Sequence, residues 1–159
     1  MATFAEVESQ EPEFAGRVRA AFDARRHKYL ATLRRDGSPR ISGIEMGFVA
    51  GEPWLAGMPG SVKFTDLRRD PRFMMHSGSH EPDEFESDAK LGGRAVPVTD
   101  PDERADYAAA AGIPAGQMGF ELFRVELDQV VLVALDEGRT ALVVSSWRPT
   151  TGLTRSLRT

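Results

Sequence analysis

Apolar residues recur at helical spacing near the start of the chain and at strand spacing over much of the remainder. Residues 11–26, EPEFAGRVRAAFDARR, place Phe14, Val18 and Phe22 on one helical face, with Pro12 near the first turn. This pattern predicts an amphipathic helix that packs on a sheet. Residues 100–112, DPDERADYAAAAG, predict a second helix, because an Asp cap, a Pro, acidic residues in the first turn and a terminal Gly follow in order.

A hairpin and several further strands are predicted downstream of the first helix. Residues 27–49 contain the turn dipeptide Asp36-Gly37 between two apolar runs, a pattern typical of a β-hairpin. Other strand-like runs are 53–58, 72–77, 89–99, 119–135 and 140–147, and the glycine pair of 89–99 suggests a bulge. Six or seven strands, mostly connected by hairpins and interrupted by short helices, predict a mainly β (α+β) fold whose antiparallel sheet curls into a barrel or sandwich.

The domain organisation is predicted to be simple. A chain of 159 residues has the length of one ordinary domain. Residues 1–10 and 148–159 are predicted to be tails, and the polar, acidic segment 78–88 is predicted to be a mobile loop. The sequence has no βαβ alternation and no glycine-rich dinucleotide fingerprint, which argues against a doubly wound nucleotide-binding fold.

Composition excludes several classes of chemistry. The sequence has no cysteine, which removes disulfides, thiolate nucleophiles and zinc–thiolate sites. A net charge of -4 argues against nucleic acid as the main partner, and no stretch has the apolar length of a membrane span. The acidic N-terminus lacks the order of a signal peptide, so a cytoplasmic location is expected.

One charge pattern suggests an anion site. Residues 60–70, GSVKFTDLRRD, predict a short helix with Ser61 as the N-cap and Arg68 and Arg69 at the favourable C-terminal end. Lys63 lies in the first turn, where a cation is disfavoured unless an anion binds there. The alternative is that Lys63 is an ordinary solvated surface residue, and the residues alone leave both interpretations open.

Other candidate groups form no recognisable site. His27, His76 and His80 are too scattered for a metal motif, and no metal site is expected. The acidic residues of 78–88 are typical of a solvated loop, and no serine lies in a nucleophile-elbow pattern.

An ordered set of short motifs resembles a known family. Residues 29–76 contain ATL, a DG turn, PRIS, GS-x-K and L-R-R-D-P-R in that order, and GRAVPVTD and W-R-P follow later. This set resembles the pyridoxamine 5'-phosphate oxidase-like family of FMN-binding split β-barrels, in particular its actinobacterial members.

The resemblance implies a homodimer that binds a cofactor in a groove at the subunit interface. FMN is the expected cofactor, and the deazaflavin F420 is the alternative. Ser61 and Lys63 match the family's phosphate-binding segment, while Trp147 could reach a neighbouring ring or could belong to the core. The complete set of cofactor-binding residues that the resemblance implies is Arg40, Ser42, Gly57, Met58, Ser61, Lys63 and Trp147.

The chain also departs from the family pattern. Val62 stands where a second phosphate-binding cation is common, and Glu45 stands roughly where true pyridoxamine phosphate oxidases have a lysine. The C-terminal R-L-x-P ending is missing, so vitamin B6 oxidation is not expected. The resemblance therefore implies an FMN- or F420-dependent oxidoreductase acting on a small organic substrate. A non-catalytic cofactor carrier or sensor and a ligand-free structural dimer are the alternatives.

Overall fold

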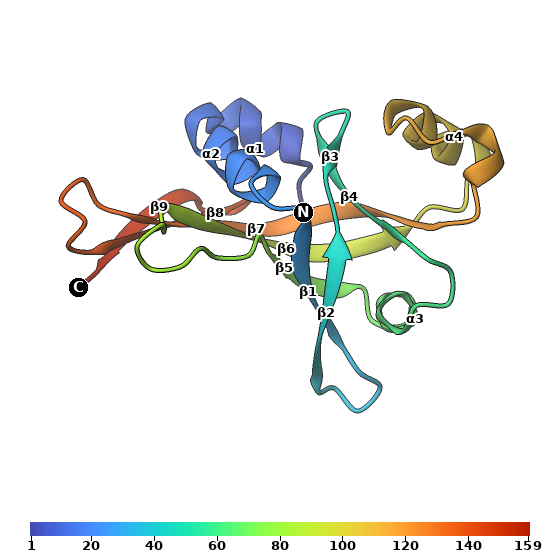
Figure 1. Ribbon diagram of the computed structural model, residues 1–159, viewed down its shortest axis with the longest axis horizontal. Coiled ribbons are helices and arrows are strands. Elements are labelled where there is room, and N and C mark those ends of the chain that lie inside the picture. The colour runs from blue at the N-terminus through green and yellow to red at the C-terminus, as the bar shows by residue number, and fades with distance from the viewer.

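The computed structural model describes residues 1–159 apart from the side chain of Ala115. Within the described part of the chain, nine strands form one sheet with the order β2-β1-β5-β6-β7-β4-β3, and β8 and β9 follow from β7 (Figure 1). All strand pairs are antiparallel. The strands are β1 (His27–Leu33), β2 (Pro39–Glu45), β3 (Phe48–Val49), β4 (Glu52–Gly57), β5 (Arg72–His76), β6 (Ser87–Pro97), β7 (Glu121–Leu135), β8 (Leu142–Arg148) and β9 (Gly152–Arg158).

The sheet curls without closing, as the predicted split barrel requires. β2 ends the sheet on one side, and the β3–β4 hairpin ends it on the other. β2 and β4 are neighbours in space, yet no ladder of hydrogen bonds joins them over the described residues. This gap between β2 and β4 is the split of the barrel.

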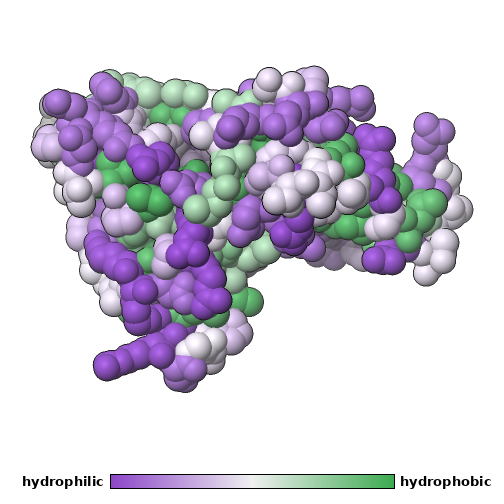
Figure 2. All heavy atoms as spheres, turned by 180° about the vertical axis from the view of Figure 1, so that it is seen from behind, coloured by the Kyte–Doolittle hydropathy of each residue, from purple (hydrophilic) through white to green (hydrophobic). Residues whose placement is uncertain are grey.

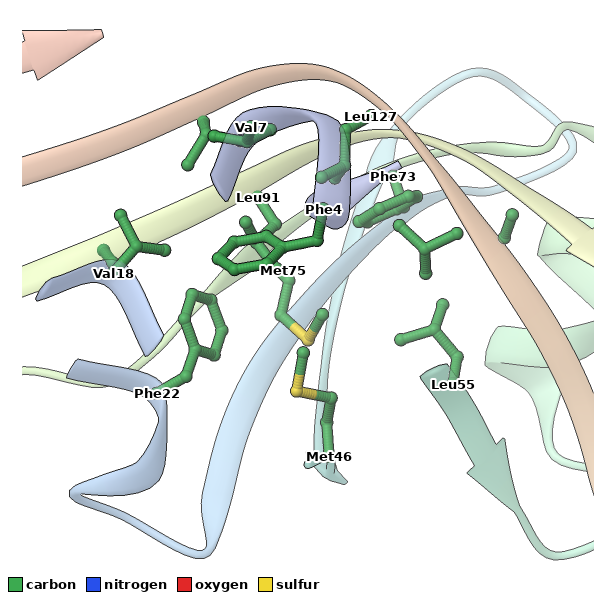
Figure 3. Close-up of a cluster of buried hydrophobic side chains, with 14 of the residues drawn as sticks. Phe4, Val7, Val18, Phe22, Met46, Leu55, Phe73, Met75, Leu91 and Leu127 are labelled. Carbon is green, nitrogen blue, oxygen red and sulfur yellow. The ribbon is translucent and has the colours of Figure 1, made fainter. Parts of the chain in front are cut away.

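Two helices cover one face of the sheet and enclose the core. Helices α1 (Phe4–Gln10) and α2 (Pro12–Asp23) pack on each other; α2 lies against β6 and β7, and α1 lies against β4 (Figure 1). Figure 3 shows Phe4 and Phe22 pointing from these helices toward Met75 and Leu91 of the sheet. Burial of these large side chains is the main favourable contribution to folding.

The remaining helices lie away from this core helix pair. Helix α3 (Val62–Arg69) connects β4 to β5. Helix α4 (Pro101–Ala110) and the short helix η1 (Ala115–Gln117) belong to the connection from the end of β6 to the start of β7 (Figure 1). The side chain of Asp100 accepts from the backbone N–H groups of Asp102 and Glu103, which confirms the predicted cap of α4. None of the described helices is both long and apolar enough to cross a membrane.

The prediction of tails at both ends was wrong. Residues 4–10 form α1, whose start carries a capping box in which Thr3 and Glu6 bond each other's backbone N–H. Phe4 and Val7 are fully buried, so this segment belongs to the core. At the other end, β9 pairs with β8 over seven residue pairs from Leu142↔Arg158 to Arg148↔Gly152.

The glycine pair of β6 produces the predicted bulge. The register between β6 and β7 shifts between Gly92 and Gly93. A Cβ on Gly93 would overlap the backbone oxygen of Glu126, so only glycine allows the two strands to come this close.

On the molecule's rear face, hydrophobic side chains are exposed in small groups among hydrophilic ones (Figure 2).

Candidate functional site

A pocket of about 590 Å³ lies in the split of the barrel, within the size range of small-molecule sites. Gly43, Ile44 and Glu45 of β2 line one side, and Ala56 and Gly57 of β4 line the other. The remaining lining residues come from the start of β1, the loop before α3, the first turn of α3 and the segment after α4: His27, Met58, Ser61, Lys63, Ile113, Gln117 and Phe120.

Hydrogen bonds hold the loop from β4 to α3 in place. Gly57 pairs with Glu121 of β7, where β4 ends. Gly60 has a φ of 75°, a conformation that favours glycine, and its N–H donates to Oε1 of Glu121 at 2.8 Å. The hydroxyl of Ser61 donates to the carbonyl of Met58 at 2.9 Å and closes the loop.

Helix α3 begins at the predicted position, but Ser61 does not cap it with its side chain. The Ser61 hydroxyl is turned to Met58, and only the Ser61 carbonyl joins the helix, accepting from Phe64 and Thr65. Among the described residues, no acceptor meets the backbone N–H of Val62 or Lys63. These two donors are therefore available to an anion at the positive end of the helix.

Lys63 adds a full positive charge to this helix end. No carboxylate of the described residues lies within 4.0 Å of its Nζ, which lies 5.5 Å from the centre of the Phe64 ring. The side chain lines the pocket. An unpaired lysine beside open N–H donors is a favourable arrangement for a phosphate group.

Close packing sets the height of α3 above the sheet. The ring of Phe64 stacks on Phe123 of β7 with centroids 5.2 Å apart. A Cβ on Gly57 would lie 3.0 Å from Cε2 of Phe64. Glycine at position 57 therefore lets α3 approach β4 without displacing the aromatic pair.

Arg40 lies beside α3 through an ion pair with Asp66. Its Nε donates to Oδ2 of Asp66 at 2.7 Å, and Asp66 also accepts from Thr32 and Arg69. Lys63 and Asp66 are three residues apart on α3, so they lie on neighbouring positions of one helical face.

A second charged group lies at the β1–β2 edge of the pocket. Glu45 pairs with Arg26 at 3.0 Å and lies 3.4 Å from Nε2 of His27. The arginine offsets the negative charge that the sequence places next to the expected phosphate site. All three side chains are more than half exposed, so these pairs contribute little to stability.

The segment after α4 forms a wall of the pocket that sequence analysis missed. Arg104 of α4 donates to the carbonyl of Val98, which precedes the helix, and to the carbonyls of Met118 and Phe120 at the end of the segment. These bonds join the beginning and the end of the connection from β6 to β7. Tyr107 lies between the rings of Trp54 and Phe120, with centroid distances of 5.2 and 5.8 Å. Burial raises the pKa of Tyr107. An arginine on α4 that is followed by a glycine-rich segment was the available signal.

The structure brings together four of the seven predicted cofactor residues. Gly57, Met58, Ser61 and Lys63 all line the pocket. The other three predicted residues, Arg40, Ser42 and Trp147, are not among its lining residues.

The three residues outside the pocket lie on two strands, β2 and β8. Arg40 and Ser42 lie on β2, the strand at the split. Trp147 lies on β8, is fully buried in the core and donates through Nε1 to Gln10 at 3.2 Å. Its core position was the alternative that the sequence left open.

A histidine–aspartate pair lies outside the pocket. Nε2 of His76 on β5 is 3.5 Å from Oδ1 of Asp88 on β6, and Nδ1 of His76 accepts from the N–H of Gly78 at 3.0 Å. Among the described residues, no three His, Cys, Asp or Glu side chains gather as a metal site would require.

The chain matches the family described as Pyridoxamine 5'-phosphate oxidase over residues 14–134. The chain belongs to this family. The matched region contains β1 to β6, all of β7 except its last residue, α3 and the whole lining of the pocket. A search of curated proteins found no match.

Solved structures share the fold. PhzG from Burkholderia lata, solved with tetrahydrophenazine-1-carboxylic acid, is 15% identical with a TM-score of 0.63, covering 98% of this chain and 95% of that one. ChuZ from Campylobacter jejuni is 13% identical with a TM-score of 0.66, covering 95% of this chain and 65% of that one. An FAD-binding protein from Mesorhizobium loti is 19% identical with a TM-score of 0.57, covering 74% and 92%.

These findings confirm the predicted family and split-barrel fold. Membership in the pyridoxamine 5'-phosphate oxidase family supports a flavin-related, oxidoreductase-type function.

Proposed function

We propose that this protein is an FMN-dependent oxidoreductase that acts on a small organic molecule. The observation that carries the proposal is the start of α3, where Lys63 lines the pocket in the split and the backbone N–H groups of Val62 and Lys63 have no acceptor among the described residues. Both donor types suit a phosphate monoester, because backbone N–H groups at a helix start and a lysine bind phosphate oxygens.

The residues of the pocket fit the rest of a flavin mononucleotide. Gly57 and Ala56 leave space at the end of β4, and Ile44, Ile113 and Phe120 provide apolar surface for a flat ring. When bound, FMN would supply hydride transfer to or from the substrate. The protein's contribution would be to hold the phosphate at Lys63, to orient the ring and to exclude water with the wall after α4.

We also propose that the protein is a homodimer. Ile41 of β2, Tyr29 of β1 and Met74 of β5 lie on the outer side of the sheet and are 75%, 57% and 38% exposed. Ala31 pairs with both Ile41 and Met74, so these side chains form an apolar row across three strands. His27 and Gly43 on the same strands line the pocket, which would bring a second copy next to it.

F420 is the alternative cofactor, because its phosphate could use the same donors. A carrier or sensor that holds the cofactor without a substrate is the alternative function. Membership in a family described as an oxidase favours an enzyme over a carrier.

The test is a titration of the purified protein with FMN, F420 and riboflavin, repeated on Lys63→Ala. Lys90→Ala is the matched control, because Lys90 lies on β6 outside the pocket. We expect Lys63→Ala to weaken FMN binding by about tenfold or more, because a hydrogen bond to a charged group contributes roughly 1.5 to 3 kcal/mol. Riboflavin, which has no phosphate, should bind wild type and variant equally.

Each result decides a different part of the proposal. No binding of FMN or F420 by wild type would reject the cofactor function, and tighter binding of F420 would replace FMN. Equal affinity of wild type and Lys63→Ala for FMN would reject the phosphate site at α3. Turnover of the reduced, cofactor-loaded protein with a panel of small acceptors then separates an enzyme from a carrier.

A further inference from the structure

Glu121, the first residue of β7, contacts the loop before α3 and also the last turn of α3. Its Oε1 accepts from the N–H of Gly60 at 2.8 Å, and its Oε2 pairs with Arg68. The side chain is only 11% exposed. Sequence analysis did not select this residue, because no motif surrounds it.

The position of Glu121 follows from the strand register. β4 pairs with β7, and Gly57, the last residue of β4, lies opposite Glu121. The chain then leaves the sheet at Met58 and returns to Glu121 through the N–H of Gly60. Glu121 is therefore next to both ends of the loop: it lies opposite Gly57 in the strand pairing, and its carboxylate accepts from Gly60, three residues later.

The geometry of the loop depends on this acceptor. Gly60 has a φ of 75°, and its N–H has no other acceptor among the described residues. The next residue, Ser61, supplies the carbonyl that starts α3. The direction of the open N–H groups of Val62 and Lys63 is therefore set by the residue that Glu121 holds.

Arg68 explains how a carboxylate can lie so close to an anion site. Phe64 and Arg68 are four residues apart, so they lie on one side of α3, the side that faces β7. Arg68 pairs with Glu121 and also lies 5.8 Å from the ring centre of Phe123. The pair is neutral overall, so Glu121 can orient the loop without repelling a phosphate group at Lys63.

We infer that Glu121 is a positioning residue for phosphate binding: it fixes Gly60 so that the first turn of α3 presents its donors to the pocket. This inference rests on the proposed function, because it assigns Glu121 a role toward the phosphate of the same cofactor. Glu121 would not touch the cofactor itself, since it is not among the pocket's lining residues.

The test compares FMN with riboflavin in wild type, Glu121→Ala, Glu121→Leu and Glu121→Gln. Leucine fills the space without an acceptor and serves if the alanine variant does not fold. Glutamine keeps an oxygen that can accept from Gly60. Glu103→Ala is the matched control, because Glu103 pairs with Arg124 at 2.9 Å and does not line the pocket.

The expected result is a loss of binding affinity for FMN, which has a phosphate, and not for riboflavin, which has none. Glu121→Ala and Glu121→Leu should weaken FMN binding by about tenfold and leave riboflavin binding unchanged, because a misdirected N–H costs about one hydrogen bond. Glu121→Gln should recover most of the FMN affinity. Glu103→Ala should match wild type with both ligands.

Other outcomes overturn the inference in distinct ways. If wild type does not bind FMN, the proposed function fails and this inference fails with it. If wild type prefers FMN to riboflavin but Glu121→Leu binds FMN equally well, only the positioning role is rejected. If both ligands lose affinity equally, Glu121 supports the fold in general and has no specific role toward phosphate. If Glu121→Gln binds FMN as weakly as Glu121→Leu, loss of the hydrogen bond from Gly60 is not the cause of the weaker binding.

Discussion

Arg40 on β2 donates through Nε to Oδ2 of Asp66 on α3 at 2.7 Å, so a buried carboxylate joins the strand at the split to the helix above the pocket. Asp66 is one of the few charged side chains in the interior, and it also accepts from Thr32 and from Arg69. The network fixes one side of α3, and Glu121 fixes the other.

Replacement of Asp66 by Asn should destabilise the protein. Burial alone would raise the pKa of Asp66, but the hydrogen bonds from Arg40, Thr32 and Arg69 outweigh this effect and lower the pKa below 3.8. We expect Asp66→Asn to reduce the free energy of unfolding by about 1–3 kcal/mol, measured by urea denaturation at pH 7. A change no larger than that of Asp70→Asn, whose partner Arg72 is 64% exposed, would contradict this role.

The same network predicts the direction of a pH effect at acidic pH. A folded-state pKa below that of the unfolded chain means that the unfolded state binds more protons. The contribution of Asp66 is therefore complete above its ordinary value of 3.8 and is lost as the pH falls through the lower, folded value. Asp66→Asn should lose less stability than wild type over this range.

The two glycines of the β6 bulge should differ in their tolerance of alanine. A Cβ on Gly93 would overlap the backbone of Glu126, which cannot move without breaking the strand pairing. A Cβ on Gly92 would lie 2.8 Å from Cε of Met74, a flexible side-chain end. We expect Gly93→Ala to reduce the free energy of unfolding by about 3 kcal/mol or more and Gly92→Ala to reduce it by about 1 kcal/mol, measured by thermal and urea unfolding. Equal losses would show that the strands can separate at the bulge.

His76 should make stability depend on pH near neutrality. Burial lowers the pKa of His76 below 6.5, Asp88 opposes this shift, and Lys90 adds to it. Protonation at Nδ1 would also remove the acceptor of the Gly78 N–H. Because the unfolded chain binds the proton more readily, stability should rise with pH from the folded pKa up to 6.5 and then level off.

The replacement His76→Asn tests this explanation, because its side-chain oxygen can still accept from Gly78. We expect a smaller slope of unfolding free energy against pH below 6.5 than in wild type. His80→Asn, in the loop between β5 and β6, serves as the matched control. An unchanged slope in His76→Asn would assign the pH dependence to other groups.

The apolar row on the outer side of the sheet should control assembly. Ile41→Glu places a charge on the face that we propose as the dimer interface, and burying an unpaired charge is costly. We expect this variant to be monomeric at about micromolar concentration by analytical ultracentrifugation, where wild type is dimeric. Leu157→Glu on β9, where Leu157 is 63% exposed, is the control and should not change the mass. A monomeric wild type would reject the interface.

Local sequence patterns were sufficient for much of the fold. The Asp36-Gly37 turn, the periodicity of α2 and the cap of α4 involve residues close together in the chain, so nearest-neighbour chemistry determines them. The motif order from residue 29 to 76 also indicated the family, which the match over 14–134 confirmed. The capping box at Thr3 and Glu6 was a local signal that was overlooked, and the alternation in β9 was too polar to identify a strand.

The sequence by itself determined most of the element types, the family and the anomalous position of Lys63 in a first helical turn. Only the tertiary structure decided which groups meet there. The contacts of Glu121 with Gly60, of Asp66 with Arg40 and of Trp147 with Gln10 span from 26 to 137 residues. Such pairs depend on strand register and sheet curvature, which bring together residues far apart in the chain. The sequence around one residue of such a pair does not indicate which residue it will contact.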